Sequence, residues 1–178
     1  KELIPAANLI PEVSPAIIVV ETPFPPDDRS SGYERGTSVS REWDEATTSA
    51  AIEIADKIVA ALPQLIDDKG ERDDKLRTFA VQFVERAFRR PLSDEVRQTH
   101  IDCQFAAAMN LEEGIRRIVL LALKSPQFLY REPTVTPDQF DRAASLSFAL
   151  LNSIPDPQLL DAARNGNLAD NKQIRDQA

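Results

Sequence analysis

The sequence predicts an all-α protein: a helical bundle with an extended proline-rich N-terminal arm and the start of a second helical unit. Three observations support this fold class. Apolar residues recur at three- and four-residue spacing in most of the chain after residue 40. Residues that start or stop helices stand between these periodic stretches. Proline is concentrated at the start, where six of the 13 prolines fall within the first forty positions.

The N-terminal part is expected to be an arm, because a proline-rich segment cannot maintain a helical hydrogen-bond ladder. Residues 16–20 are rich in β-branched side chains, which is typical of either a short strand or part of an extended arm. We expect the arm to wrap over a helical body. The chain is therefore divided into a Pro-rich arm (residues 1–37), a helical bundle domain (38–132) and the incomplete start of a second helical domain (133–178).

The first two predicted helices are bounded by prolines. One starts after Ser40 and runs to about Leu62, where Pro63 ends or kinks it. The second covers about residues 73–90, before Pro91. Its last turn carries two arginines, whose positive charge complements the exposed carbonyl groups there.

Capping residues predict the next two helices of the bundle. Ser93 is expected to cap a third helix over residues 94–109, and Asn110 with Glu113 forms a capping-box pattern for a fourth over residues 111–124. The fourth helix is apolar nearly all round in its second half, so we place it at the centre of the bundle. Ser125-Pro126 ends it.

The second unit contains three further predicted helices. Thr136-Pro137 and Gln139 are expected to be N-cap, first-turn proline and capping-box partner of the first of them. Asp156-Pro157 caps the next, and Asn165-Gly166 ends it in a left-handed conformation. A last helix begins at Asp170 or Asn171.

Composition excludes several function classes. The net charge of −8 and the pI near 4.8 argue against nucleic acid and against an anionic membrane surface as partners. No apolar run approaches the roughly 20 residues of a membrane span. The single cysteine, Cys103, permits neither an internal disulfide nor c-type haem attachment, which needs two cysteines and a histidine.

His100 and Cys103 form the one candidate pair of nucleophilic or metal-ligating side chains on a single helix. Their spacing of three residues allows both to point the same way, as in a Cys-His nucleophile or half a metal site. The chain has no second histidine or cysteine to complete a metal site. The favoured interpretation is a packed cysteine and a partly buried histidine on the inner face of the helix.

Two acidic groups resemble cation sites. One imitates a calcium loop around Gly166, but its third and twelfth positions are Ala163 and Lys172, so a helix stop is favoured. The other, an acidic stretch within residues 67–74, is interpreted as a solvated surface loop. The residues of the two groups are, respectively, Asp161, Asn165, Gly166 and Lys172, and Asp67, Asp68, Glu71, Asp73 and Asp74.

Four arginines could form an anion site if their helices meet: Arg89, Arg90, Arg116 and Arg117. The four arginines can also be explained without a ligand, because they can pair with Glu85 or Glu113 and their positive charge complements the helix dipoles. Asp27-Asp28 beside Arg29 is interpreted as a turn. We therefore predict no catalytic, cofactor-binding or metal-binding residue, and no cofactor in this fragment.

Several stretches resemble domains of unknown function. Residues 83–96, with the core Ala-Phe-Arg-Arg-Pro-Leu-Ser-Asp-Glu, resemble the signature of one helical family, and residues 125–132 resemble its closing motif. Gly114 fits the middle of that domain. Residues 140–178 are similar to the opening of the domain that follows it, with Asn-Ser-Ile-Pro-Asp at 152–156.

The resemblance implies a large, exported protein of the planctomycete type, often linked to c-type cytochrome domains and sometimes to carbohydrate-binding domains. The expected location is extracytoplasmic, periplasmic or secreted. The expected partners are other domains of the same longer chain, of which this sequence is expected to be a piece. The expected function is that of a non-catalytic structural or interaction module, in an electron-transfer context. The alternative is a ligand- or glycan-binding domain of a polysaccharide-degrading enzyme. The oligomeric state stays open.

Overall fold

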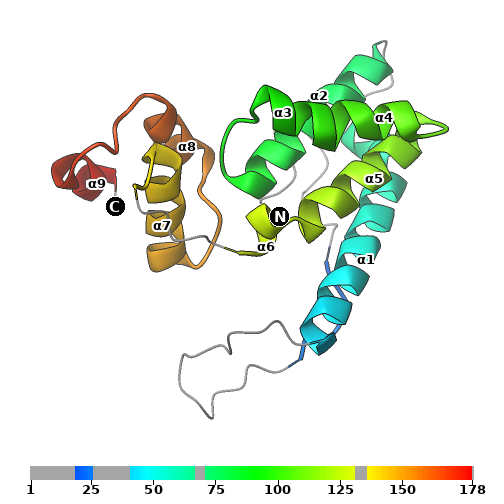
Figure 1. Cartoon of the computed structure of the whole chain (residues 1–178), viewed down its shortest axis with the longest axis horizontal. Helices are drawn as coiled ribbons and strands as arrows, with labels where there is room; N and C mark the ends of the chain where they lie inside the picture. The colour runs from blue at the N-terminus through cyan, green and yellow to red at the C-terminus, as the bar shows by residue number, and fades with distance from the viewer. Residues whose placement is uncertain (1–18, 26–40, 67–70, 131–135, 178) are drawn as a thin grey trace.

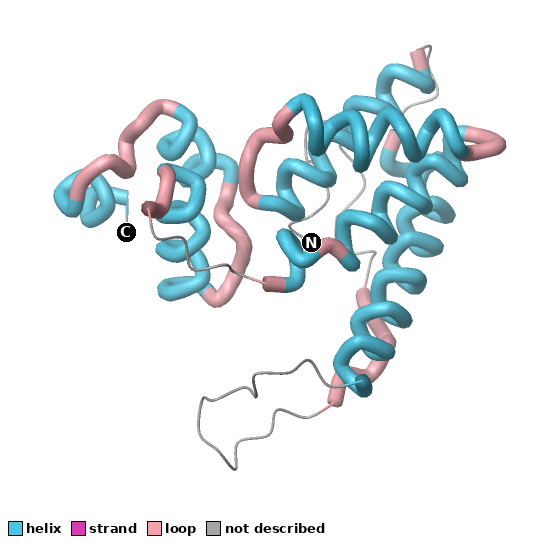
Figure 2. The backbone as a smooth tube through the Cα atoms, in the orientation of Figure 1, coloured by secondary structure: helices cyan, strands magenta, loops and turns pink. Residues whose placement is uncertain are grey.

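The computed structural model describes residues 19–25, 41–66, 71–130 and 136–177. Within these ranges the regular structure is helical and no strand forms, which confirms the all-α prediction (Figures 1 and 2). None of the described helices combines the length and the hydropathy needed to cross a bilayer. The predicted turn at residues 27–29 and the acidic residues 67 and 68 lie outside the described ranges.

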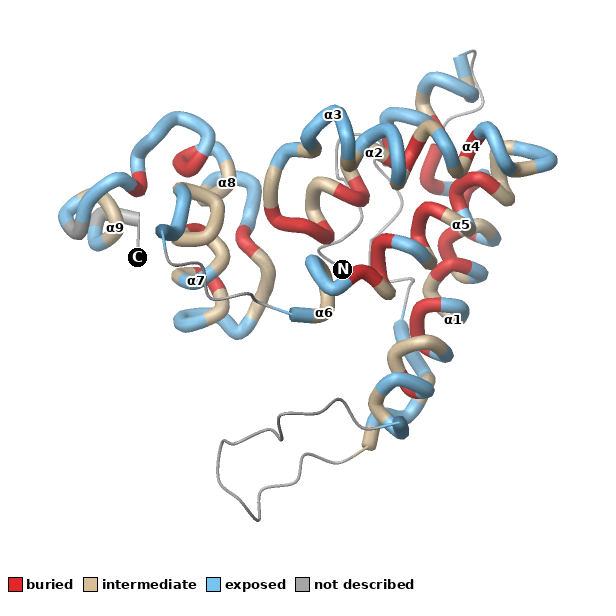
Figure 3. Tube along the Cα trace, in the orientation of Figure 1, coloured by how far each residue is buried: buried red, intermediate tan, exposed pale blue. Residues whose placement is uncertain are grey.

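The larger group of helices is organised around α5 (Leu111–Lys124), which packs against α1 (Arg41–Leu65) and α2 (Arg72–Phe88). Its apolar side is buried over several turns (Figure 3). The central position predicted for this helix is therefore confirmed. The largest fully buried side chains of the cluster are Ile58, Leu62, Leu76, Phe79, Phe83, Val84, Ile101, Ile115, Ile118 and Val119.

The first helix runs past Pro63 to Leu65, three residues beyond the predicted end. A proline this close to the C-terminus of a helix removes one hydrogen bond of the last turn. Leu65 and Ile66 are almost completely buried in the core beyond it. Burying each of these side chains contributes about 2 kcal/mol, which offsets the missing bond.

The third predicted helix is interrupted by a wider turn. Its first part, α3 (Asp94–Arg97), is capped by Ser93 as predicted, since the Ser93 hydroxyl accepts a hydrogen bond from the Val96 N–H. A π-helical turn, η3 (Gln98–Asp102), follows, and α4 (Cys103–Ala107) completes the run. The helix ends two residues before the predicted boundary, and the π turn changes which side chains face the core.

Helix α5 crosses α4 at close range because Gly114 has no side chain. A Cβ atom at this position would stand 2.4 Å from Cδ1 of Phe105. Asn110 caps α5 by accepting the Glu113 N–H at 2.8 Å, while the Glu113 carboxylate accepts the N–H of Met109. The predicted cap is confirmed, with the reciprocal bond moved one residue upstream.

The second group of helices has a smaller core. It comprises α7 (Gln139–Leu151), α8 (Pro157–Arg164) and α9 (Asn171–Gln177), and α7 packs on α8. Its buried centre and the partly buried residues around it are Ala143, Ala163, Leu168, Phe140, Leu159 and Ile174. Asp156 caps α8 as predicted, by accepting the Leu159 N–H at 2.8 Å.

The predicted N-cap of α7 is wrong. Asp138, two residues after Thr136, occupies the cap and forms a reciprocal capping box with Asp141. Gln139 is the first residue of the helix, and its side chain accepts the N–H of Leu168 from the end of the unit. Both aspartates also pair with an arginine of the first group of helices, and this tertiary contact favours Asp138 over Thr136.

Candidate functional site

The end of α2 has a backbone conformation that is uncommon for a residue other than glycine. Helix α2 stops at Phe88, and Arg89 takes a left-handed conformation with φ 60°. The Arg89 N–H donates to the Arg86 carbonyl, and the Arg90 N–H donates to the Glu85 carbonyl. These two bonds form a Schellman stop, in which the left-handed residue is usually glycine. The helix was predicted to continue through both arginines.

The Arg89 side chain is buried in spite of its charge, with 8% of the residue exposed. Its guanidinium donates to the Gln127 carbonyl at 2.5 Å and more distantly, at 3.4 Å, to those of Phe128 and Tyr130. It also donates to the Ala87 carbonyl of its own helix. Carbonyls at a helix C-terminus lack partners within the helix and carry partial negative charge.

Arg89 therefore caps two helices at once: α2 and the short α6 (Pro126–Leu129). The sequence predicted the first of these roles but not the second. This side chain joins the two motifs of the family resemblance, because it belongs to the first motif and binds backbone carbonyls of the second. The motifs are residues 83–96 and the described part of 125–132. The Arg89 guanidinium also lies 5.8 Å from the ring centre of Phe148 in α7.

Arg90 reaches the second group of helices directly. Its guanidinium donates to the Asp141 carboxylate at 2.5 Å and to the Asp138 carboxylate at 3.2 Å. These two aspartates form the capping box of α7, so one arginine of the bundle binds the start of α7. We call Arg89 and Arg90, with their partners in α6 and α7, the arginine joint.

The other two predicted arginines lie elsewhere on α5 and bind different elements. Arg116 pairs with Asp56 of α1 at 3.2 Å. Arg117 pairs with Glu113 and donates to the Ala107 carbonyl, which confirms the predicted Glu113 pairing. The Glu85 carboxylate accepts the Leu92 N–H. The described contacts thus direct the four arginines to separate partners rather than to a shared anion.

The structure places His100 and Cys103 in different surroundings. His100 packs edge-on against the Phe88 ring at 5.2 Å, and its Nδ1 atom is buried with no hydrogen-bond partner among the described residues. Cys103 is exposed and lies 3.7 Å from the Gln98 side-chain amide. The prediction of a packed cysteine is therefore wrong, because the π turn between the two residues alters the helical register.

The acidic groups do not form a metal centre in the described ranges. There, no three His, Cys, Asp or Glu side chains are placed to hold an ion. Gly166 has φ 74° and ends α8, which confirms the predicted helix stop at the calcium-like stretch.

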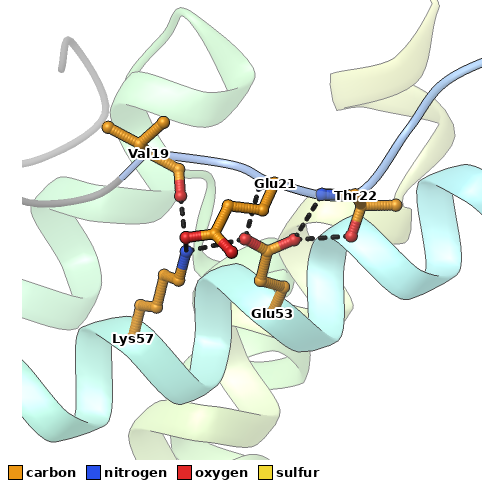
Figure 4. A network of polar contacts seen from close by, with 5 residues as sticks. All are labelled: Val19, Glu21, Thr22, Glu53 and Lys57. Carbon is orange, nitrogen blue, oxygen red and sulfur yellow. Dashed lines mark hydrogen bonds and ion pairs between the residues drawn. The ribbon is translucent and has the colours of Figure 1, made fainter.

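A second polar network holds the described part of the arm on α1 (Figure 4). The Glu53 carboxylate accepts the N–H groups of Glu21 and Thr22, at 2.6 and 2.8 Å, and the Thr22 hydroxyl at 2.5 Å. Lys57 donates to the Val19 carbonyl at 2.6 Å and to Glu53 at 2.8 Å. We call Glu53 and Lys57 the clasp. Residues 19–25 form neither a helix nor a strand, so the alternative of a short strand is not found at Val19 and Val20.

These contacts stabilise the charged forms of both clasp residues. Hydrogen bonds from Lys57 above all, and also from Thr22 and Glu21, lower the pKa of Glu53 from 4.5 to about 2. The bond to Glu53, followed by that to Glu21, raises the pKa of Lys57 above its ordinary value. Both groups are therefore charged when the segment is bound at neutral pH.

The sequence alone did not identify the arginine joint or the clasp. The only local signal for the clasp was the spacing of four between Glu53 and Lys57, which is common on helix surfaces. The partners of Arg89 in α6 and of Arg90 in α7 lie 38 to 51 residues away in sequence. No periodicity connects positions at that separation.

Comparison with known proteins gives two matches, both to families without an assigned function. Residues 75–132 match the family model described as PSD5: Protein of unknown function (DUF1595). Residues 138–178 match the model described as PSD4: Protein of unknown function (DUF1592). No curated protein and no solved structure matches the chain. The chain is therefore similar, in two successive stretches, to two domain families of unknown function, as the sequence motifs indicated.

Proposed function

We propose that this chain is a non-catalytic interaction module of a longer protein, in which two helical domains are fixed to one another. The proposed division is a Pro-rich arm over residues 1–37, a bundle over 38–132 and the start of a second domain over 133–178. In this proposal no residue is catalytic and no cofactor is bound within the fragment.

The observation that carries the proposal is the arginine joint. Arg90 belongs to the stretch that matches the first family, and Asp138 and Asp141 belong to the stretch that matches the second. The buried Arg89 guanidinium is directed at the carbonyls of α6, near the end of the first stretch. The charged groups that most resembled a ligand site thus bind other parts of the same chain.

The wider setting rests on the resemblance described from the sequence. We propose that the parent protein is exported, of the planctomycete type, and works in an electron-transfer context beside c-type cytochrome domains. The partners of the module are then other domains of that chain. The competing proposal is that the chain binds glycans as part of a polysaccharide-degrading enzyme. The ligand screen described below distinguishes the two proposals.

The joint can be tested by the rotational diffusion of the two units, measured by amide ¹⁵N relaxation on the whole chain. In the wild type, residues of α5 and of α7 are expected to report one common correlation time. Arg90→Gln is expected to shorten the correlation time of α7 relative to α5. Arg116→Gln is the matched control, since it removes an ion pair of similar exposure between α5 and α1.

A change in Arg116→Gln equal to that in Arg90→Gln, or none in either, contradicts the joint. The non-catalytic part is tested separately by a thermal-shift screen of the whole chain against oligosaccharides and oxyanions. We expect no shift in Tm. A saturable shift with a glycan would favour the competing function.

A further inference from the structure

A partly buried flank of α1 holds an extended segment at three points in sequence order. Val19 contacts Lys57, Glu21 and Thr22 contact Glu53, and the ring of Phe24 lies 5.4 Å from that of Trp43. The segment therefore runs antiparallel to α1 (Figure 4). Along a helix, the distance from position 57 to position 43 is about 21 Å, which an extended segment of this length, with its side chains, can cover.

The clasp recognises the backbone of an extended chain. One carboxylate accepts two consecutive N–H groups, those of Glu21 and Thr22, while the Lys57 ammonium binds the carbonyl of Val19. In a helix or a paired strand these backbone groups would already be bonded. Hydrogen bonds with an ionised partner are about twice as strong as neutral ones. The Thr22 hydroxyl and the Phe24 ring add side-chain selectivity.

The segment contributes little to the hydrophobic core. Val19 is 62% exposed and Phe24 is 44% exposed. None of the described residues of the segment belongs to the buried cluster of the bundle, to which α1 contributes other residues, among them Ala55, Ile58 and Leu62. The bundle core therefore does not depend on which copy of the segment occupies the clasp.

We propose that the face of α1 formed by Trp43, Glu53 and Lys57 is a peptide-docking site that also takes residues 19–25 of a second copy of this chain. A second copy presents the same backbone and side-chain groups, so an exchanged segment reproduces every contact. Fifteen residues, 26–40, separate the segment from α1 in sequence. This connection gives the chain's own segment an effective concentration in the millimolar range, which keeps the exchanged form minor in the wild type. The proposal is independent of the function proposed above.

The test uses whole chains and a synthetic peptide of residues 17–26. Trp43 is the single tryptophan, so its fluorescence reports occupancy of the site. The acceptor variant Thr22→Pro loses two of the donors to Glu53 and keeps the site intact. We expect it to bind the peptide about ten-fold more tightly than the wild type, whose own segment competes. Adding Glu53→Gln to the acceptor is expected to weaken binding by about ten-fold.

The exchange itself is tested by mixing two whole-chain variants. The donor, Glu53→Gln, has an intact segment and a weakened site, and the acceptor, Thr22→Pro, has the reverse. Sedimentation of the mixture is expected to show a heterodimer that neither variant forms alone. Lys57→Met replaces Glu53→Gln as donor if the latter has an altered circular dichroism spectrum.

Absence of a saturable fluorescence change in the acceptor overturns the proposal, as does equal affinity with and without Glu53→Gln. A mixture that stays monomeric above the measured peptide Kd also overturns it, and leaves the segment as an intramolecular strap.

The pH dependence of peptide binding is a second readout. The groups facing Glu53 are Lys57 of α1 and Glu21 and Thr22 of the segment. The pKa of Glu53 is lowered in the bound state, so its contribution is full above about pH 4.5 and is lost as the pH falls towards 2. Peptide binding to the acceptor is expected to weaken in that window, and a binding curve unchanged across it contradicts the role of Glu53.

Discussion

Two helices of this protein end in the same way with different residues. At the end of α2, the left-handed position is Arg89, with φ 60°, and at the end of α8 it is Gly166, with φ 74°. Both stops have the same pair of backbone bonds, one to the carbonyl three residues back and one, from the next residue, to the carbonyl five back. Arg89 is buried, and Gly166 is exposed.

The difference shows that a left-handed helix stop without glycine needs additional stabilising contacts. A left-handed conformation costs a non-glycine residue about 1 kcal/mol or more. At Gly166 this cost does not arise, because glycine adopts a positive φ without a steric penalty. At Arg89 the cost is offset by the bonds from the guanidinium to the carbonyls of α6. The stop at Arg89 is thus a tertiary contact, whereas the stop at Gly166 is local.

The largest effect is expected for Arg89→Ala. This variant keeps the strained backbone and removes the donors to the buried carbonyls, so we expect the free energy of unfolding to fall by about 3 kcal/mol. Chemical denaturation measures it. Arg97→Ala, at an exposed arginine of α3, is the control and should change stability by less than about 0.5 kcal/mol.

Replacing Arg89 by glycine separates strain from side-chain bonding. Arg89→Gly loses the same guanidinium but relieves the left-handed strain, so we expect it to be about 1 kcal/mol more stable than Arg89→Ala. The same denaturation curves measure the difference. If the glycine variant were the less stable of the two, backbone strain at Arg89 would not lower the free energy of unfolding.

The local stop should respond only through its backbone. A Cβ atom at Gly166 would meet nothing within 4 Å, so Gly166→Ala is expected to cost about 1 kcal/mol through the left-handed conformation alone. Thermal unfolding of the variant measures the cost, with Asn165→Ala as the neighbouring control, since φ is −86° there. Equal losses in both would show that side-chain contacts, not the positive φ, hold this stop.

The smallest effect is expected at the second arginine of the joint. The Arg90 side chain is 42% exposed and its ion pairs are open to solvent, so Arg90→Gln should lower the free energy of unfolding by only about 0.5 kcal/mol. High salt should reduce the difference from the wild type. A loss as large as that of Arg89→Ala would mean that the two arginines act as one buried unit.

The local signals in the sequence predicted the helix boundaries that local chemistry decides. Ser93, Asn110 and Asp156 cap the helices that they were expected to cap, and Gly166 ends α8. The prediction failed at Thr136, because Asp138 caps α7 while it also binds Arg90. Two residues with similar capping ability were available, and a distant arginine favours one of them.

The candidate site was less predictable than the fold. The arginines were recognised as the unusual charges of the chain, but their partners were expected nearby in sequence. Glu53 was not singled out, because an acid four residues before a lysine is an ordinary feature of a helix surface. Cys103 was expected to be packed, and a π turn, which no sequence pattern indicated, exposes it.

The sequence by itself determined the all-α class, the centre of the bundle and most helix ends, because periodicity and capping act within a few residues. Only the tertiary structure decided that Arg89 ends α2 by capping α6, that Arg90 binds the start of α7, and that α1 holds residues 19–25 through Glu53 and Lys57. These contacts join residues 31 to 51 positions apart. Folding brings them together by burying apolar surface elsewhere, and the charged groups then pair with the partners that this packing places within reach.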